Sequence, residues 1–335
     1  MRAPAFWWET PPSALARALQ PLGALYGAAT ARRMQGAGAP APVPVICVGN
    51  FTAGGAGKTP TALALAALLR GAGEHPAFLS RGYGGRLAGP VLIDPRQHGA
   101  REVGDEPLLL ARGAPTVVAR DRPAGAALAV EAGASVIVMD DGLQNPSLAK
   151  DFGLAVVDGA VGIGNRLSLP AGPLRAPLAA QWPKVHAVLV IGSGAPGEAI
   201  AGEAAALGKP VWRASLAPDP VAAARLKGVR VLAFAGIGRP DKFFRSLEAC
   251  GAVVEEERSF SDHHPYTAAD MARLAGEAGA KGLQLVTTEK DRVRLEGLGL
   301  PLGPVQTLPV SLAFEDEAAV RAAILAALAR RRGLL

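Results

Sequence analysis

The chain has 335 residues, of which 50% are hydrophobic and 19% are charged, which suits a soluble α/β protein with a large core and two domains of ~150 residues each. Its formal charge of +6 suits an acidic ligand or an anionic membrane surface, and no basic run is interleaved with aromatic residues, so we expect no nucleic-acid partner. The two cysteines, Cys47 and Cys250, form neither a CxxC metal site nor a disulfide framework, which fits a reducing cytoplasm.

Residues 1–42 precede the first expected strand and combine aromatic, apolar and basic residues. The aromatic run Phe6 to Trp8 comes before Thr10, where a helix is expected to begin. The longest uncharged piece is too short and too rich in glycine to span a bilayer, and Pro21 breaks any secretory pattern. Two interpretations remain open: a helix docked on the protein's own core, or one lying in a membrane interface. One face of this helix would carry Leu15, Leu19, Leu22, Leu25 and Tyr26.

The stretch from Val43 to Thr61 predicts a phosphate-binding loop. An apolar run reads as a buried strand, a glycine-rich loop follows, and a helical pattern begins after Gly57-Lys58-Thr59. Glycines allow backbone N–H groups to surround phosphate oxygens, Lys58 can reach the β- and γ-phosphates, and the Thr59 hydroxyl can ligate Mg²⁺. The pattern GxxxxGK[ST] is not fully met, because Thr52 replaces its first glycine, and a turn without a ligand is the alternative. The expected nucleotide-binding residues are Gly54, Gly55, Ala56, Gly57, Lys58 and Thr59.

A short strand at residues 77–79 leads into a glycine-rich segment with Arg81 at its start. Because α/β sheets bind ligands where strands end, Arg81 is expected to meet a phosphate, and a solvated turn is the alternative. Further along, Gly104-Asp105-Glu106-Pro107 opens a helix. Asp105 has two interpretations, a helix N-cap or a catalytic carboxylate.

The apolar strand Val136 to Met139 ends in Asp140 and Asp141. A strand that ends in aspartate supplies the second Mg²⁺ contact of phosphate-loop proteins. Two adjacent carboxylates repel one another unless a cation lies nearby, so the pair indicates a metal site, with an Asp-Asp-Gly turn as the alternative.

Strands continue at 154–157 and at 188–191, where we expect the first sheet to close, and between them a proline- and glycine-stiffened loop carries Arg175. Strands alternating with helices predict a parallel, doubly wound sheet. The second half begins again after residue 210, with strands expected at 231–235, 252–260 and 305–310, a strand then loop over 285–291 and a final helix. The expected ranges are 1–42 for an N-terminal membrane-associating helix and linker, 43–207 for a phosphate-loop kinase core and 208–335 for a smaller α/β domain that closes over the site.

Six motifs, in this order and at these separations, resemble the tetraacyldisaccharide 4′-kinases of lipid A synthesis: GNFTAGGAGKTP, SRGYGG, GDEP, DDGLQ, LPAGPLR and DHHPY. The likeness covers nearly the whole chain, the ordered set is highly specific, and threonine at position 52 is usual in that family. The resemblance implies that ATP phosphorylates the 4′-hydroxyl of an acylated glucosamine disaccharide 1-phosphate. It also implies a peripheral enzyme, expected to be a monomer, at the cytoplasmic face of the inner membrane, with the N-terminal helix engaging the bilayer.

The resemblance further implies roles for individual residues. Asp105 matches the catalytic carboxylate and His263 its partner, although on its own His263 would read as a residue at a helix start capped by Asp262. Physical chemistry supports the pair, because a positioned carboxylate can accept the proton of a sugar hydroxyl and a histidine can orient that carboxylate. Since the two residues come from different halves, the active site is expected in an interdomain cleft. Lys58 and Thr59 would hold phosphates and Mg²⁺ with Asp140 and Asp141, and the expected substrate residues are Arg81, Glu106, Gln144 and Arg175.

Two rival classes share the phosphate-binding loop. A nucleotide-dependent switch of the GTPase type usually carries a guanine-reading NKxD motif, and the nearest match here, residues 287–291, is only distantly similar. A soluble small-molecule ligase would not need Trp7, Trp8 and the leucine-rich helix face.

Overall fold

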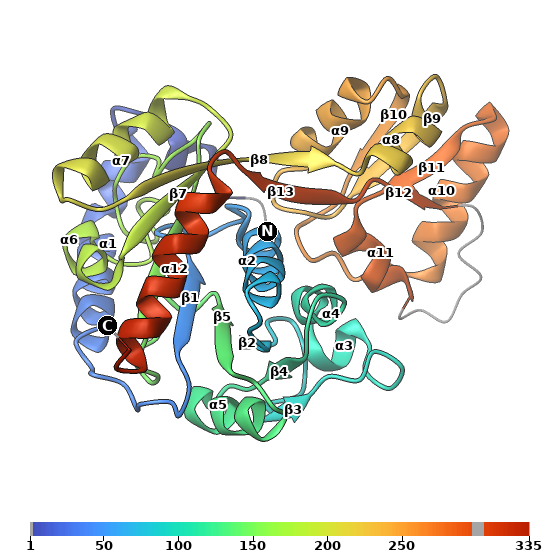
Figure 1. Ribbon diagram of the computed structural model, residues 1–335. Helices are drawn as coiled ribbons and strands as arrows, with labels where there is room; N and C mark the ends of the chain where they lie inside the picture. Colours follow the sequence, from blue (N-terminus) through green and yellow to red (C-terminus); the bar gives the residue numbers. More distant parts are fainter. Residues whose placement is uncertain (1–2, 297–304, 335) are drawn as a thin grey trace.

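A large sheet of nine strands forms the centre of the computed structural model, which describes residues 3–296 and 305–334 (Figure 1). The two edge pairs are antiparallel and every other neighbouring pair is parallel. In order across the sheet the strands are β13 (Val310–Phe314), β8 (Val211–Pro218), β7 (Ala187–Ile191), β6 (Phe152–Asp158), β1 (Val45–Gly49), β5 (Val136–Asp140), β2 (Pro76–Ser80), β4 (Thr116–Val118) and β3 (Val91–Leu92).

Helices cover both faces of this sheet, as the apolar strands require. The core on one face joins alternate strand residues to α2 (Lys58–Gly71), α4 (Asp105–Ala111) and α12 (Glu317–Arg331). The core on the other face joins the intervening strand residues to α5 (Arg122–Glu131), α6 (Leu178–Gln181) and α7 (Ala195–Ala206). The predicted doubly wound parallel sheet is therefore confirmed. The short elements α3 (Ala100–Val103) and η2 (Trp182–Lys184) complete its connections.

A second sheet of four parallel strands forms a smaller domain at the upper right of Figure 1. Its strands, in order, are β10 (Val253–Ser259), β9 (Arg230–Ala235), β11 (Gln284–Thr287) and β12 (Gln306–Thr307). One core of this domain includes side chains from α8 (Pro220–Leu226) and α9 (Pro240–Ala249), and the other includes side chains from α10 (Ala268–Lys281) and α11 (Glu289–Glu296).

Three sequence-based expectations for the second half differ from the structure. The large sheet does not close at residue 191, because β8 and β13 extend it, so the range expected for the smaller domain contains elements of both units. The loop expected after the strand within 285–291 is instead the start of α11: β11 ends at Thr287, and Thr288 accepts a hydrogen bond from the Asp291 N–H at 3.1 Å and caps the helix. The strand expected at 305–310 is two strands, separated at Pro309, which has no N–H to donate to a ladder.

Two strands that lie far apart in the sequence connect the two domains. β8 and β13 pair in antiparallel register, with Leu216 opposite Leu312, and Figure 1 shows both extending between the large sheet and the smaller domain. An interface core adds to this connection, since Val293 of α11 packs in one buried cluster with Leu108 of α4.

The N-terminal segment consists of η1 (Ala5–Trp8) and α1 (Ala14–Arg33). The helix begins later than expected, because the Ser13 side chain accepts from the Ala16 N–H, and Pro21 lies inside the helix without ending it. Its small residues face the protein: a Cβ on Gly23 would lie 2.7 Å from the Ser168 carbonyl oxygen. Large apolar side chains remain exposed, with Leu25 71% accessible. None of the helices within the described residues has the length and apolar character needed to cross a membrane.

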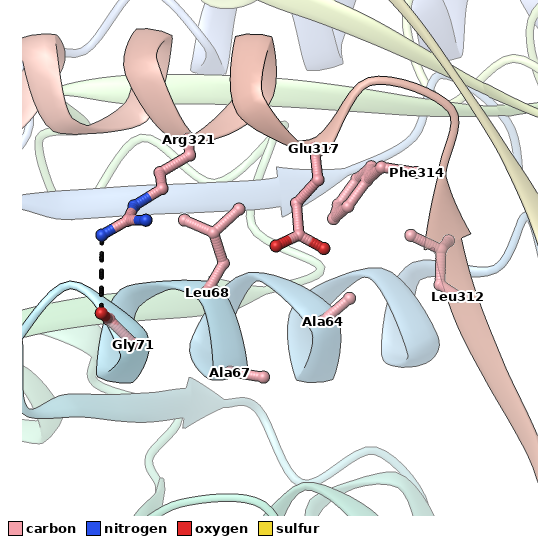
Figure 2. Close-up of a pocket in the computed structure, with 8 residues that line it drawn as sticks. All are labelled: Ala64, Ala67, Leu68, Gly71, Leu312, Phe314, Glu317 and Arg321. Atoms are coloured by element: carbon pink, nitrogen blue, oxygen red, sulfur yellow. Dashed lines mark hydrogen bonds between the residues drawn. The ribbon is translucent and has the colours of Figure 1, made fainter.

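A pocket of about 280 Å³ lies between α2, β13 and α12 (Figure 2). The Arg321 side chain crosses from α12 and donates to the Gly71 carbonyl at the end of α2, at 3.5 Å. None of the residues predicted to act in catalysis or nucleotide binding lines this pocket. Its walls are Ala64, Ala67, Leu68, Gly71, Leu312, Phe314, Glu317 and Arg321.

Candidate active site

The phosphate-binding loop connects β1 to α2 at the middle of the large sheet. Gly54 and Gly57 have φ angles of 109° and 92°, a region that favours glycine. Asn50 Nδ2 donates to the Gly54 carbonyl at 3.1 Å and fixes the loop from within. No side chain caps the N-terminus of α2, so its first N–H groups are free to bind an anion. Glycine torsions and a free helix end give the loop the geometry of a phosphate cradle.

The loop lysine lies against an acidic residue that directly follows the neighbouring strand β5. Lys58 is buried, with Nζ 3.4 Å from Asn50 Oδ1 and 3.8 Å from Asp141 Oδ1. Arg175 Nη1 binds the same Asp141 oxygen at 2.7 Å, and Arg175 Nε donates to the Thr52 carbonyl at 2.9 Å. Burial acts to raise the pKa of Asp141, but Lys58 and Arg175 outweigh it and lower that pKa. Asp141 is therefore an ionised group between two cations.

Asp140 lies one residue before Asp141, and its backbone pairs with Val48 of β1. Burial, with the charges of Glu106 and Asp141, raises the pKa of Asp140 to about 7. Its Oδ1 is buried and makes no hydrogen bond within the described residues. An unpaired carboxylate oxygen beside a second carboxylate fits Mg²⁺, which prefers oxygen ligands. No group of three or more His, Cys, Asp or Glu side chains in the described residues forms a metal cluster, so the Thr59 hydroxyl and phosphate or water oxygens would have to complete the shell.

Asp105 and His263 meet across the two domains. His263 Nδ1 lies 3.0 Å from Asp105 Oδ2, and Asp105 is only 4% exposed. Neither residue has the structural role considered as an alternative: Gly104 is the N-cap of α4 and Asp105 its first residue, while His263 precedes α10, which Thr267 caps. His263 has φ of 57°, an uncommon conformation for a residue with a side chain. Local strain at such a residue is typical of a functional site.

Two cations on α11 approach the same acidic residues. Arg294 Nε donates to Asp105 Oδ2 at 2.7 Å, and Lys290 Nζ donates to Glu106 Oε1 at 2.9 Å while lying 3.3 Å from His263 Nε2. Burial acts to raise the pKa of Asp105, but the hydrogen bond from His263 and the charges of Lys290 and Arg294 outweigh it, so that this pKa lies well below its usual range. Neither cation was predicted as a site residue from the sequence, although their spacing of four residues places them on one face of a helix.

A phosphate cradle, an adjacent acidic pair and an interdomain Asp–His pair are the parts expected of a phosphoryl-transfer enzyme. The family profile described as "Tetraacyldisaccharide-1-P 4'-kinase" matches residues 15–329. The chain belongs to this kinase family. Its membership confirms the resemblance carried by the ordered motifs, and it makes the chain an enzyme that transfers a phosphoryl group in lipid A biosynthesis.

Several members of this kinase family are similar over nearly their whole length. A tetraacyldisaccharide 4′-kinase of Methylobacterium nodulans is 66% identical over 98% of this chain and 96% of its own. One from Rhodopseudomonas palustris is 56% identical over 96% of this chain and 95% of its own. The crystal structure of LpxK from Aquifex aeolicus in complex with ATP superposes with a TM-score of 0.72 at 26% identity, covering 94% of this chain and 99% of that one.

The remaining predicted residues of the kinase occupy different surroundings. Arg81 is exposed at the end of β2 and makes no ion pair within the part of the chain that the structure describes. Gln144 is buried, and its Nε2 donates to the Asn50 carbonyl at 2.8 Å and to Gln181 Oε1 at 2.7 Å. Gln144 therefore supports the start of the phosphate loop in this conformation, whereas Arg81 is accessible to a ligand. Tyr83, in the segment after Arg81, packs edge-on against His263 with ring centroids 5.4 Å apart.

A further polar contact joins the two domains of the kinase beside the phosphate loop. Asp158 ends β6, and its Oδ2 accepts from Arg239 Nη1 at 2.6 Å and from Lys242 Nζ, both at the start of α9. A Cβ built on Gly238 would lie 3.9 Å from the Gly55 nitrogen. The smaller domain thus approaches the nucleotide loop as well as the Asp105 region.

Proposed function

We propose that this kinase transfers the γ-phosphoryl group of ATP to the 4′-hydroxyl of a tetraacyldisaccharide 1-phosphate. The names of its relatives support the acceptor, and the ATP complex of the Aquifex aeolicus protein supports the donor. One observation carries the mechanism: Asp105 and His263 lie 3.0 Å apart, at the point where the smaller domain meets the sheet that bears the phosphate loop. A buried proton acceptor beside a phosphate cradle is the arrangement that transfer to an alcohol needs.

In this mechanism Asp105 accepts the proton of the 4′-hydroxyl. The hydroxyl oxygen forms a bond to the γ-phosphorus, the bond from that phosphorus to the β,γ-bridging oxygen breaks, and ADP leaves with the bond electrons. His263 holds the carboxylate in place. With Lys290 donating toward Nε2, a neutral His263 carries its proton on Nδ1 and donates it to Asp105.

The nucleotide phosphates would bind the loop amides of Gly54 to Gly57, the N-terminus of α2 and Lys58. Lys58 would exchange its contacts with Asn50 and Asp141 for the β- and γ-phosphates. Thr59, Asp140 and Asp141 would hold Mg²⁺, with the unpaired Oδ1 of Asp140 as the supporting observation. When bound, this ion neutralises charge on the phosphate oxygens and helps to align them.

The acceptor would contact the residues around the Asp–His pair. We assign Arg81 to a phosphate of the substrate, because it is exposed and free of ion pairs among the described residues. We assign Glu106, which follows Asp105 on α4 and whose Oε1 accepts from Lys290 Nζ, to the sugar. The contacts of Gln144 and Arg175 with the phosphate loop favour an indirect role, in which they shape the site that the substrate enters.

The lipid part of the substrate requires access to a membrane. The exposed leucines of α1, with the basic residues Arg32 and Arg33 in its last turn, support peripheral binding to an anionic surface. We propose that the enzyme works as a monomer at the cytoplasmic face of the inner membrane, with residues 1–42 in contact with lipid and the smaller domain closing over the phosphate loop.

The test is transfer of label from γ-labelled ATP to the disaccharide lipid by the full-length enzyme. We expect Asp105→Ala to abolish transfer and Asp94→Ala to retain it, because the half-buried Asp94 carboxylate accepts from Arg96 and Gln97 in its own turn. Turnover by Asp105→Ala at the wild-type rate would show that another group accepts the proton.

A further inference from the structure

A buried arginine of α11 holds the same carboxylate oxygen as His263. The side chain of Arg294 is 7% exposed, and its Nε donates to Asp105 Oδ2 at 2.7 Å. Its Nη1 donates to Asp291 Oδ1 and to the Gly236 carbonyl, both at 2.9 Å. One planar guanidinium therefore spans from the core of the smaller domain to the first residue of α4.

The Nη1 end of the Arg294 guanidinium is anchored independently of Asp105. Asp291 is fully buried, and apart from Arg294 it accepts from Tyr266 OH at 2.8 Å, from the Gly236 N–H at 3.0 Å and from Thr288 Oγ1 at 2.6 Å. A buried carboxylate with four donors is well satisfied and holds its partners in fixed positions. The Nη1 end of the guanidinium is thus held by contacts within the smaller domain.

The contacts also distinguish the two oxygens of Asp105. Among the described residues, Oδ2 receives both His263 Nδ1 and Arg294 Nε, whereas Oδ1 receives one donor, the Glu106 N–H at 2.8 Å. Oδ1 is therefore the oxygen with more acceptor capacity left. An incoming hydroxyl would therefore donate to Oδ1.

We propose that Arg294 is a positioning residue that fixes the Asp105 carboxylate with Oδ1 directed to the acceptor hydroxyl, and that Asp291 and Tyr266 anchor it. The inference rests on the proposed role of Asp105 as proton acceptor. Arginine suits this task because its fork makes two hydrogen bonds at a fixed angle, while lysine supplies only a point charge. Because the fork belongs to the smaller domain, Asp105 is fully oriented only when that domain is docked on α4.

Other charged groups face Asp105 and must be separated from Arg294 in the test. They are His263 before α10, Lys290 on α11 and Glu106 on α4. Lys290 contacts Glu106 and His263, so its removal would change the histidine as well. Arg294 contacts Asp105 without contacting His263, which makes it the cleaner substitution.

The experiment compares full-length Arg294→Met, Arg294→Lys and Arg292→Met with the wild-type enzyme in labelled-ATP transfer across a pH series. Arg292 is the matched control, because it lies two residues away on α11 and binds Glu296 and the Val305 carbonyl instead of Asp105. For Arg294→Met we expect kcat to fall about 10²-fold, the loss typical of a misplaced catalytic group, with KM for ATP nearly unchanged. The acid limb of kcat/KM should move to higher pH.

Arg294→Lys tests whether the planar geometry of the guanidinium or only its positive charge is needed to position Asp105. We expect it to recover little of kcat, whereas recovery of the wild-type rate and pH profile would show that only charge matters and would overturn the proposal. A wild-type kcat in Arg294→Met would overturn it as well.

Tyr266→Phe is the second variant, for the case that Arg294→Met does not fold. This substitution weakens the anchor of Arg294 without altering charge, so we expect a several-fold loss of kcat with KM retained. An unchanged kcat in Tyr266→Phe counts against the proposal.

Asp105→Asn separates failure of this inference from failure of the proposed function. If Asp105→Asn turns over normally, the assignment of the proton acceptor is wrong, whatever Arg294 does. If Asp105→Asn is inactive while Arg294→Met keeps the wild-type rate and pH profile, only the positioning role is wrong.

Discussion

Arg239 Nη1 donates a hydrogen bond to Asp158 Oδ2 over 2.6 Å and joins the start of α9 to the end of β6. Lys242 donates to the same oxygen. We expect Asp158→Asn to weaken this contact, since a neutral amide attracts the two cations less, and so to increase the radius of gyration measured by small-angle scattering. Because both cations are about one-third exposed, the difference between wild type and variant should shrink at high salt.

Asp121→Asn is the control for that change. Asp121 caps α5 in the larger domain, where its Oδ1 accepts from the Ala124 N–H, and it makes no hydrogen bond or ion pair with the described residues of the smaller domain. It should leave the radius of gyration unaltered. An Asp158→Asn protein with wild-type scattering at low salt would show that the contact does not hold the domains together.

The pH dependence of catalysis follows from the lowered pKa of Asp105. A carboxyl group whose pKa is depressed in the folded state stays ionised above that value, and the stability it contributes is lost only as pH falls through it. We therefore expect kcat/KM at saturating Mg²⁺ to show no loss assignable to Asp105 between neutral pH and about pH 5. His263→Ala removes a hydrogen bond that lowers this pKa, so its acid limb should lie at higher pH. An identical limb in both proteins would contradict the assignment.

The exposed face of α1 gives a prediction about lipid binding. Leu22 and Leu25 are 57% and 71% accessible, so serine at both positions should leave the fold intact. Because burying one leucine contributes about 1.5–3 kcal/mol, the pair should weaken binding to anionic vesicles by at least about tenfold. Leu207→Ser is the control, since Leu207 is 54% exposed at the end of α7. Equal binding by all three proteins, measured by vesicle sedimentation, would exclude α1 as the contact.

Features set by neighbouring residues were predictable from the sequence. The apolar run of β1, the glycine loop after it and the aspartates that end β5 depend on local pattern, and they lie where the pattern places them. The pairing of β8 with β13 was not predictable, because it joins segments about a hundred residues apart. It depends on the smaller domain folding so that the chain leaves it beside the edge of the large sheet. α11 was missed because most of its residues are charged, so it shows little apolar periodicity. The contact of Asp105 with His263 was expected only through the family resemblance.

The phosphate loop itself offers a test of its glycines. Gly57 has φ of 92°, and a Cβ there would lie 2.6 Å from Ile191 Cδ1 in β7. A left-handed conformation costs a residue with a side chain about 1–2 kcal/mol, and the clash adds to this cost. Gly57→Ala should therefore lower the free energy of unfolding in a denaturant titration and weaken binding of a fluorescent ATP analogue.

Gly55 is the matched position two residues earlier. A Cβ on Gly55 would meet no heavy atom within 4 Å, and the φ angle of Gly55 is not in the positive range. Gly55→Ala should therefore keep the free energy of unfolding of the wild type, even if it alters nucleotide affinity by crowding the phosphates. Equal unfolding free energies for the two alanine variants would mean that the loop relaxes around residue 57. Neither the backbone torsion nor the contact with Ile191 would then require glycine at position 57, and the prediction would be wrong.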